Sequence, residues 1–223
     1  MGMTIAILVI LGLLFFVERI KPELVQRMEE NFLALLLATI TLVSFAQVIA
    51  RYGFNTGWGG TLEFTRILFA WMILFGMSYG IKTGTHLGVD AVIRLFPKSL
   101  FKSAALFGAL CSILYGVILL SADWLQYFGA STKGGAIAYW TRFFNAGIGL
   151  DDLRYPEWFQ DMFGMQERVQ RWVAYLMLPI SLGLFAYRCL QACIQIWRGE
   201  RELIIASHEA EDLVAENKNV LQD

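Results

Sequence analysis

The chain has 223 residues and a formal net charge of −1, with 57% of its residues hydrophobic and only 17% charged. A soluble domain carries charge on roughly a quarter of its residues. The composition therefore indicates an integral membrane protein, and without a basic balance it argues against a nucleic-acid-binding protein. Three cysteines, all within apolar stretches, favour neither a disulfide framework nor a metal site.

The chain begins with an apolar run at residues 3–17. This run is short for a membrane span, which needs about 20 apolar residues. It also lacks the basic start and the small-residue cleavage site of a signal peptide. We expect an N-terminal region, residues 1–28, in which a hydrophobic helix embeds in the membrane outside the core bundle and a basic cytoplasmic segment follows.

Four further segments are long and apolar enough to cross a bilayer, and each is bounded by charged or aromatic residues suited to the interface. They predict an all-α integral membrane protein with a four-transmembrane-helix core bundle, supplemented by the N-terminal helix and by interfacial amphipathic helices. The predicted spans are residues 31–50, 64–81, 100–122 and 172–197.

Orientation follows from the basic residues, which concentrate before the first of these spans, between the second and third, and after the fourth. The positive-inside rule places these regions in the cytoplasm. We therefore expect the long connection, residues 123–171, on the outer side. We expect the acidic tail, residues 199–223, to lie in the cytoplasm.

The long connection contains one amphipathic pattern. Pro156 suits a helix start, and Trp158, Phe159, Met162 and Phe163 then fall on one face of a short helix. We expect that helix to lie in the headgroup plane.

Glycines follow one another at a spacing of four along the second span and its exit, at Gly76, Gly80, Gly84 and Gly88. Small residues at this spacing let another helix backbone approach closely, which is a main source of cohesion between helices in lipid. The ridge predicts a helix contact, and both a neighbour within the chain and a partner subunit are compatible with it.

Ionisable residues near the spans are costly in a membrane and are individually informative. Glu63 and Arg66 share a helix face at the outer start of the second span and can pair, and Arg51 can join them. We expect Arg188, in the inner half of the last span, to extend its charged end to the cytoplasm. No acidic residue occupies the middle of a core span, which weighs against a self-sufficient ion transporter.

His86 and Asp90, four residues apart, follow the glycine ridge. Such a pair could orient a catalytic base, contact a subunit or anchor the exit of the span. No recognisable nucleophile accompanies it, a zinc site needs three or four ligands, and no nucleotide-binding motif occurs. We interpret the pair as a structural anchor and expect no catalytic residue, metal or cofactor.

The stretch RYGFNTGWGGTLEFTRILFAWMILFGMSYGIKTGTHLGVD, residues 51–90, resembles the small membrane subunit of tripartite ATP-independent periplasmic (TRAP) transporters, the DctQ-type family. The resemblance rests on an Arg-aromatic pair, a Glu that opens the next span, a glycine-rich exit and a His-x-x-x-Asp, and it extends over residues 29–198. The matching residues are Arg51, Tyr52, Phe54, Glu63, Arg66, Trp71, Gly76, His86, Asp90 and Pro97.

The resemblance implies a non-enzymatic subunit of the bacterial inner membrane. It would scaffold a large permease subunit of the DctM type for sodium-driven uptake of a carboxylate, with a C4-dicarboxylate as the commonest case. A periplasmic substrate-binding protein of the DctP type would deliver the substrate, and membrane lipid is the remaining partner. The long connection, which is not obligatory in the family, is a candidate for further contacts with these proteins.

The ionisable residues, the glycine ridge and the His–Asp pair together give the expected set of structural or subunit-contact residues: Arg51, Glu63, Arg66, Gly76, Gly80, Gly84, His86 and Asp90. Two alternatives stay open at this point. One is a self-contained oligomeric channel or carrier, and the other is a membrane enzyme that uses His86 and Asp90.

Overall fold

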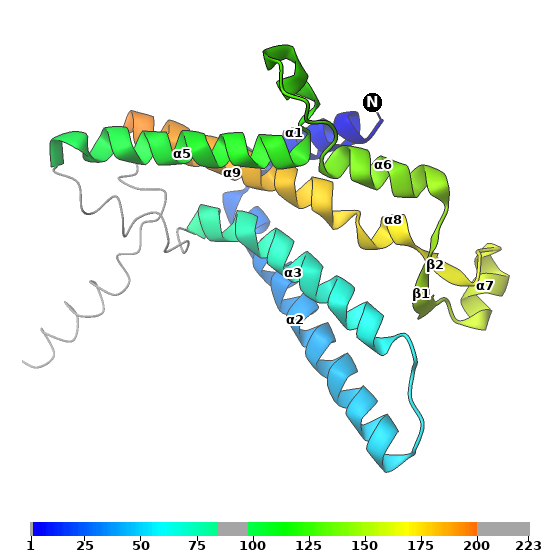
Figure 1. The fold of residues 1–223 in the computed structure, drawn as a ribbon. Coiled ribbons are helices and arrows are strands. Elements are labelled where there is room, and N and C mark those ends of the chain that lie inside the picture. The colour runs from blue at the N-terminus through cyan, green and yellow to red at the C-terminus, as the bar shows by residue number, and fades with distance from the viewer. Residues whose placement is uncertain (1, 84–97, 200–223) are drawn as a thin grey trace, which may run out of the picture. The chain divides into compact units, whose positions relative to one another are not determined.

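Figure 1 shows the fold as a computed structural model, which describes residues 2–83 and 98–199. Within those residues, five helical segments are long and apolar enough to cross a membrane, which confirms the prediction of an all-α integral membrane protein. They are α1 (Gly2–Ile20), α2 (Pro22–Gly53), α3 (Thr61–Thr83), α5 (Lys98–Leu120) and the consecutive pair α8 (Arg171–Ala174) and α9 (Met177–Arg198).

The described residues form two compact units. The first combines α1, α2, α3 up to Gly76, and the chain from Val117 to Leu184. The second combines the rest of α3, α5 up to Gly116, and α9 from Phe185 onward.

In the first unit, α1 turns directly into α2 at Lys21, which leaves helical geometry (φ −140°, ψ 75°). Pro22 then occupies the start of α2, where its missing N–H costs nothing and its fixed φ suits a helix. As a result, α2 begins earlier than the predicted span at residue 31. The predicted basic segment forms the end of α1 and the first turns of α2 instead of a separate loop.

The N-terminal helix, which we expected outside the core bundle, contacts the beginning of α9. Ile7 is buried. A Cβ atom added at Gly183 would lie only 2.9 Å from Ile7 Cγ2. The two helices therefore approach each other at a point where α9 carries no side chain.

An antiparallel pair forms from α2 and the first part of α3 (Figure 1). The rings of Phe32 and Phe75 meet edge to face, with 4.9 Å between their centroids. Such aromatic pairs add about 0.5–1.5 kcal/mol beyond the area that they bury.

The second unit has a core of small side chains between α5 and α9. Ala105 and Ala192 are fully enclosed, and a Cβ atom at Gly116 would lie 2.9 Å from Cδ1 of Phe185. Small residues at a helix contact let the backbones approach closely. This close packing holds the second unit together.

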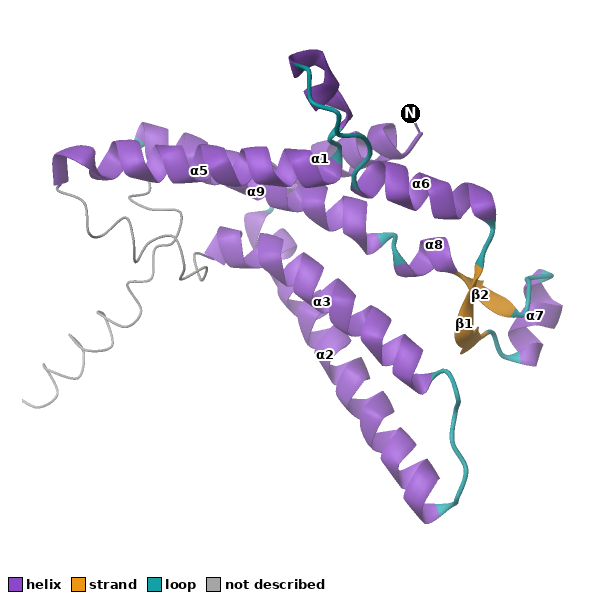
Figure 2. Ribbon diagram, in the orientation of Figure 1, coloured by secondary structure: helices purple, strands orange, loops and turns teal. Residues whose placement is uncertain are grey.

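The long connection is more ordered than the one short helix that the sequence predicts (Figure 2). That helix is confirmed as α7, which follows Pro156. The 3-10 helix η1, the helix α6 and an antiparallel pair of strands were not predicted. The elements are η1 (Asp123–Phe128), α6 (Ala136–Ala146), β1 (Gly149–Arg154), α7 (Glu157–Phe163) and β2 (Arg168–Gln170).

The strands β1 and β2 form a hairpin whose register shifts between Gly149 and Arg154, as at a β-bulge. The shift lets Leu150 and Leu153 both point into the protein although they are three positions apart, a spacing that places side chains on opposite faces of a regular strand. Together with Val169 of β2 they form a buried cluster against the first turns of α3.

Candidate functional site

Only some of the residues singled out from the sequence can be placed. Gly84, His86 and Asp90 lie outside the described residues. Arg51, Glu63, Arg66, Gly76 and Gly80 are described. Across the described ranges, no group of three or more His, Cys, Asp or Glu side chains could hold a metal ion.

Glu63, in the first turn of α3, is bound to the β-hairpin. Its Oε2 atom accepts hydrogen bonds from the backbone N–H groups of Asp152 and Leu153, both at 2.8 Å. A carboxylate that accepts two N–H groups forms charge-assisted bonds, which are roughly twice as strong as neutral ones. The hairpin is therefore clasped to the start of α3 by a single side chain.

The ion pair that the sequence suggested for Glu63 does not form. Neither Arg66 nor Arg51, both exposed, lies within ion-pair distance of Glu63 in the described structure. Helical spacing places Glu63 and Arg66 on neighbouring positions of one face, but the two backbone donors of the hairpin hold the carboxylate. Arg51 lines a separate, polar pocket of about 730 Å³ beside the loop between α2 and α3.

That loop is braced by Gln47 of α2. Its side-chain amide donates to the carbonyl of Trp58 at 3.2 Å and accepts from the backbone N–H of Trp58 at 3.1 Å. One glutamine thus satisfies both backbone groups of one loop residue. Gly57 makes room for it, because a Cβ atom there would lie 2.9 Å from Gln47 Nε2.

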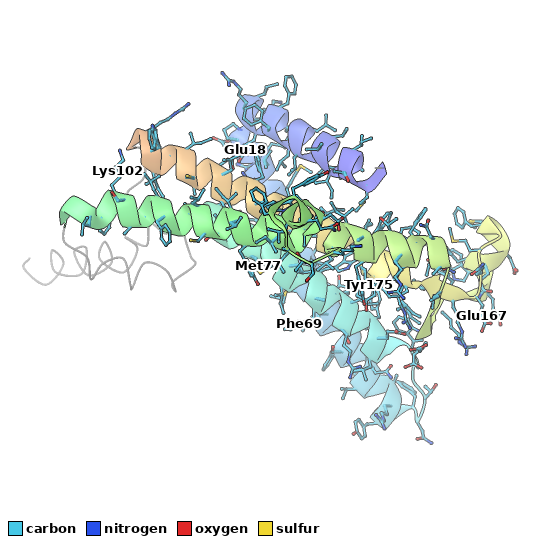
Figure 3. The ribbon with its side chains drawn as sticks, turned by 45° about the horizontal axis from the view of Figure 1, so that its top comes forward. Glu18, Phe69, Met77, Lys102, Glu167 and Tyr175 are labelled. Carbon is cyan, nitrogen blue, oxygen red and sulfur yellow. The ribbon has the colours of Figure 1, made fainter. Side chains whose placement is uncertain are left out.

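A pocket of about 940 Å³ lies between the first turns of α3 and the β-hairpin. Its walls are mainly apolar and aromatic, and at its edge Arg154 forms an ion pair with Glu167, which Figure 3 labels at the far end of the hairpin. The lining includes Trp58, Phe64, Trp71, Leu153, Tyr155 and Val169. These side chains provide a surface for binding and packing.

The interruption between α8 and α9 is stabilised by an indole. Trp71 Nε1 donates to the carbonyl oxygen of Ala174 at 2.7 Å. This carbonyl lies where the helix is broken, just before Tyr175 (Figure 3). A second indole, Trp140 Nε1 of α6, donates to the carbonyl of Trp172 at 3.1 Å. Both bonds satisfy backbone acceptors that would be costly to leave unpaired in an apolar environment.

The glycine ridge faces the protein where it is described. A Cβ atom at Gly76 would be in ordinary van der Waals contact with Leu33 of α2, at 3.9 Å. Gly80 is buried as well. Of the two uses that the spacing allowed, packing within the chain is therefore the one observed at Gly76.

Arg188 of α9 is buried, with 2% of its surface exposed. Its Nη1 atom donates to Gln191 Oε1 at 2.7 Å, and Gln191 Nε2 donates to the hydroxyl of Tyr187 at 2.7 Å. The guanidinium also lies 5.5 Å from the centroid of the Tyr187 ring, within cation–π range. The prediction that this arginine extends to the cytoplasm is wrong, because protein groups enclose it.

Sequence reasoning missed Gln47, and it missed the hairpin that holds Glu63. A lone glutamine inside an apolar helix is a usable signal, because its amide needs partners. Glu63, Gln47, Trp71 and Trp140 share one property: each connects one part of the chain to another, whereas the bonds of Arg188 stay within α9. Such an arrangement fixes helices, a loop and a hairpin in place.

Comparisons with known proteins agree with a transport component. Residues 40–199 match the family model described as "Tripartite ATP-independent periplasmic transporters, DctQ component". The chain is 33% identical over 198 residues to the C4-dicarboxylate TRAP transporter small permease protein DctQ of Vibrio cholerae, covering 85% of this chain and 80% of that protein.

The protein with the same description in Pseudomonas aeruginosa is 27% identical over 215 residues, covering 83% of this chain and 90% of that protein. A putative TRAP transporter small permease protein of Haemophilus influenzae is 30% identical over 128 residues, covering 54% of this chain and 77% of that protein. The chain thus belongs to the DctQ family, the small permease components of tripartite ATP-independent periplasmic transporters, which are transport proteins and not enzymes.

Proposed function

We propose that this multi-pass membrane protein is the subunit that scaffolds the large, DctM-type permease subunit for sodium-driven uptake of a C4-dicarboxylate. A DctP-type binding protein on the periplasmic side delivers the substrate. The observation that carries the proposal is the similarity, over most of both chains, to relatives that are described as small permease proteins of C4-dicarboxylate transporters.

The polar residues support a structural role. Glu63, Gln47 and Arg188 each bond to other groups of this chain. A transporter that moves its own substrate needs polar groups that are available to the substrate in at least one state. Binding and translocation are therefore assigned to the large subunit.

The exposed apolar surface offers room for that partner. In α2, only 6% of the membrane-spanning window is buried within this chain, against 44% for Arg171–Arg198. Leu42 of α2 and Phe107 of α5, for example, are both largely exposed. Small residues and shape, more than hydrophobicity, decide helix association in lipid, so these faces are available to lipid and to a partner subunit.

The proposed orientation places both ends of the four-span core in the cytoplasm, with the C-terminus on that side. Lys102 near the start of α5 donates to the carbonyl of Trp197 in the last turn of α9 at 3.0 Å (Figure 3). The start of α5 and the end of α9 therefore lie on the same side of the membrane, and the basic residues near them favour the cytoplasmic side. Phosphatase fusions after residue 199 test this orientation: no activity is expected, and an active fusion contradicts it.

Reconstitution tests the transport role. Vesicles receive the large subunit alone, this chain alone, or both, together with the binding protein and labelled succinate. Uptake is expected only with both subunits, a binding protein and an inward sodium gradient. Uptake by this chain alone would indicate a self-contained carrier, and full uptake by the large subunit alone would remove the need for a scaffold.

A photoreactive amino acid at Leu42, or at Phe107 as the matched position on another exposed face, identifies the docking surface. The scaffold role predicts that at least one of the two positions crosslinks to the large subunit. If neither position crosslinks and the two subunits separate on purification, the scaffold role is refuted.

A further inference from the structure

The chain between α5 and α6, residues 121–135, forms a closed loop that we call the finger. It stands off from the start of α6 as the dark green projection in Figure 1 (see also Figure 2). Its neck is held by two hydrogen bonds: Ala122 N–H donates to Gly134 O at 2.6 Å, and Gly134 N–H donates to Asp123 Oδ1 at 2.7 Å. Compact loops whose ends meet in this way are Ω-loops and are frequently functional.

Gly135 allows the two ends of the finger to meet at its neck, because it has no side chain. Its φ is +138°, and a Cβ atom there would lie 2.8 Å from both Leu120 O and Ser121 Cα. These are backbone atoms, which cannot move aside as a flexible side chain can. The base of the finger is therefore fixed by close backbone contact.

The finger presents two aromatic rings at its tip. Tyr127 is 92% exposed and Phe128 is 80% exposed. Trp124, which is partly buried, supports Phe128 edge to face with 6.0 Å between the ring centroids. The backbone of the tip is held as well, since Ala130 N–H donates to the carbonyl of Leu125 at 3.2 Å. The rings are thus held outward by an ordered turn.

The composition of the finger favours lipid over a polar partner. The two charged residues, Asp123 and Lys133, lie at the neck, and residues 124–132 between them carry no charge. Trp and Tyr concentrate at membrane–water interfaces, where one end of the ring is apolar and the other is wet. An exposed loop that faced only water would gain nothing from this composition.

The position of the finger agrees with its composition. It starts directly after the candidate membrane span Leu100–Leu120. The helix η1 has six residues, and at about 2.0 Å per residue it is about 12 Å long. The interfacial layer on each side of a bilayer is roughly 5–8 Å thick. Because η1 is longer than this layer is thick, the tip stays at the interface when η1 runs along the membrane plane, and a lipid anchor requires that direction.

We propose that the finger is a lipid anchor: Tyr127 and Phe128 insert into the boundary between headgroups and acyl chains in the leaflet where α5 ends. The ligand is the phospholipid interface, with no particular headgroup required. The anchor fixes the depth of the junction between α5 and α6 in the membrane. It acts whichever substrate the transporter carries.

A spin label at Phe128, introduced as Phe128→Cys in the full chain with its three native cysteines changed to alanine, tests the anchor in phospholipid nanodiscs. The measured quantity is the accessibility of the label to two collision partners. Oxygen concentrates in lipid, and a nickel chelate stays in water. Leu114→Cys, on the exposed side of α5 in mid-span, gives the lipid reference. Lys133→Cys, at the neck, gives the water reference.

The anchor predicts that the label at Phe128 has a lower nickel accessibility than the label at Lys133 and an oxygen accessibility between those at Lys133 and Leu114. Nickel accessibility equal to that at Lys133 would overturn the proposal. So would a label that loses nickel accessibility only after the large subunit or the binding protein is added, because a protein partner would then cover the tip.

Hydroxyl-radical footprinting of the native chain in nanodiscs repeats the test without any substitution. If water covered them, rings as exposed as Tyr127 and Phe128 would oxidise fast. Protection of both rings in the isolated subunit is expected, and fast oxidation would refute the anchor.

Discussion

Replacing Glu63 with glutamine should loosen the β-hairpin from α3. The substitution keeps the shape of the side chain and one acceptor oxygen but removes the charge. Hydrogen bonds to a charged group contribute about 1.5–3 kcal/mol each, and neutral ones about 0.5–1.5 kcal/mol. Two such bonds are affected, to Asp152 and Leu153, and the one to Asp152 is exposed to solvent. A loss of about 1–2 kcal/mol remains, because water partly replaces the exposed bond.

That loss corresponds to a roughly 5- to 30-fold increase in the open population of the hairpin. Hydrogen exchange of peptides covering β1, followed by mass spectrometry, measures it, because amides exchange from the open state. Glu157→Gln is the matched control, since it makes the same change on α7, where no hydrogen bond of the side chain occurs in the described structure. Equal exchange of β1 in the two variants, or exchange unchanged from the parent, would refute the role of Glu63 as a clasp.

Three further predictions concern packing and buried charge. Gly183→Ala should lower the free energy of unfolding by about 1–3 kcal/mol, because the added methyl group overpacks against Ile7. Adding Ile7→Ala to the same chain should restore part of this loss, as measured by thermal unfolding. If the losses of the two single variants simply add in the double variant, the contact is contradicted. Gly135→Ala should lower the melting temperature more than Gly129→Ala, because only at Gly135 would the added Cβ atom collide with backbone atoms. At Gly129 the added Cβ meets no atom within 4 Å, so only the left-handed backbone strain of about 1–2 kcal/mol applies. Equal melting temperatures of the two variants would count against the closed neck. Arg188→Ala should cost about 1–3 kcal/mol because it leaves the partly buried Oε1 atom of Gln191 without this donor, whereas Arg188→Lys should cost less. An alanine variant as stable as the parent would show that the network does not stabilise the protein.

The membrane spans could be predicted from the sequence because length and hydrophobicity alone determine which segments can cross a bilayer. Their ends were less accurate. The start of α2 depends on Pro22 and on the tight turn at Lys21, neither of which contributes to an apolar run. The break between α8 and α9 depends on a hydrogen bond from Trp71, which lies far away in the sequence.

The hairpin was missed because the bulge in β1 removes the alternation by which a strand is recognised. Leu150 and Leu153 are both buried although their spacing is not that of one face of a regular strand. The helix α6 was missed although Gly135 and Gly147 flank it and Gly147 adopts the left-handed conformation (φ 60°) typical of a helix end.

The polar residues show the same limit. Local spacing suggested that Glu63 pairs with Arg66, but two backbone N–H groups from the long connection hold the carboxylate. Distance from the end of the span suggested that Arg188 reaches water, but neighbouring groups enclose it. For Glu63 the deciding partner comes from the hairpin, far away in the sequence, whereas Arg188 bonds to Gln191 on its own helix and is buried by the packing around that helix.

Affinity purification of this chain from its native membrane in mild detergent, followed by mass spectrometry of what accompanies it, tests the scaffold role most directly. The scaffold role predicts one large multi-spanning membrane protein in stoichiometric amount. Recovery of this chain alone, as a stable oligomer, would contradict the scaffold role and favour a self-contained channel or carrier.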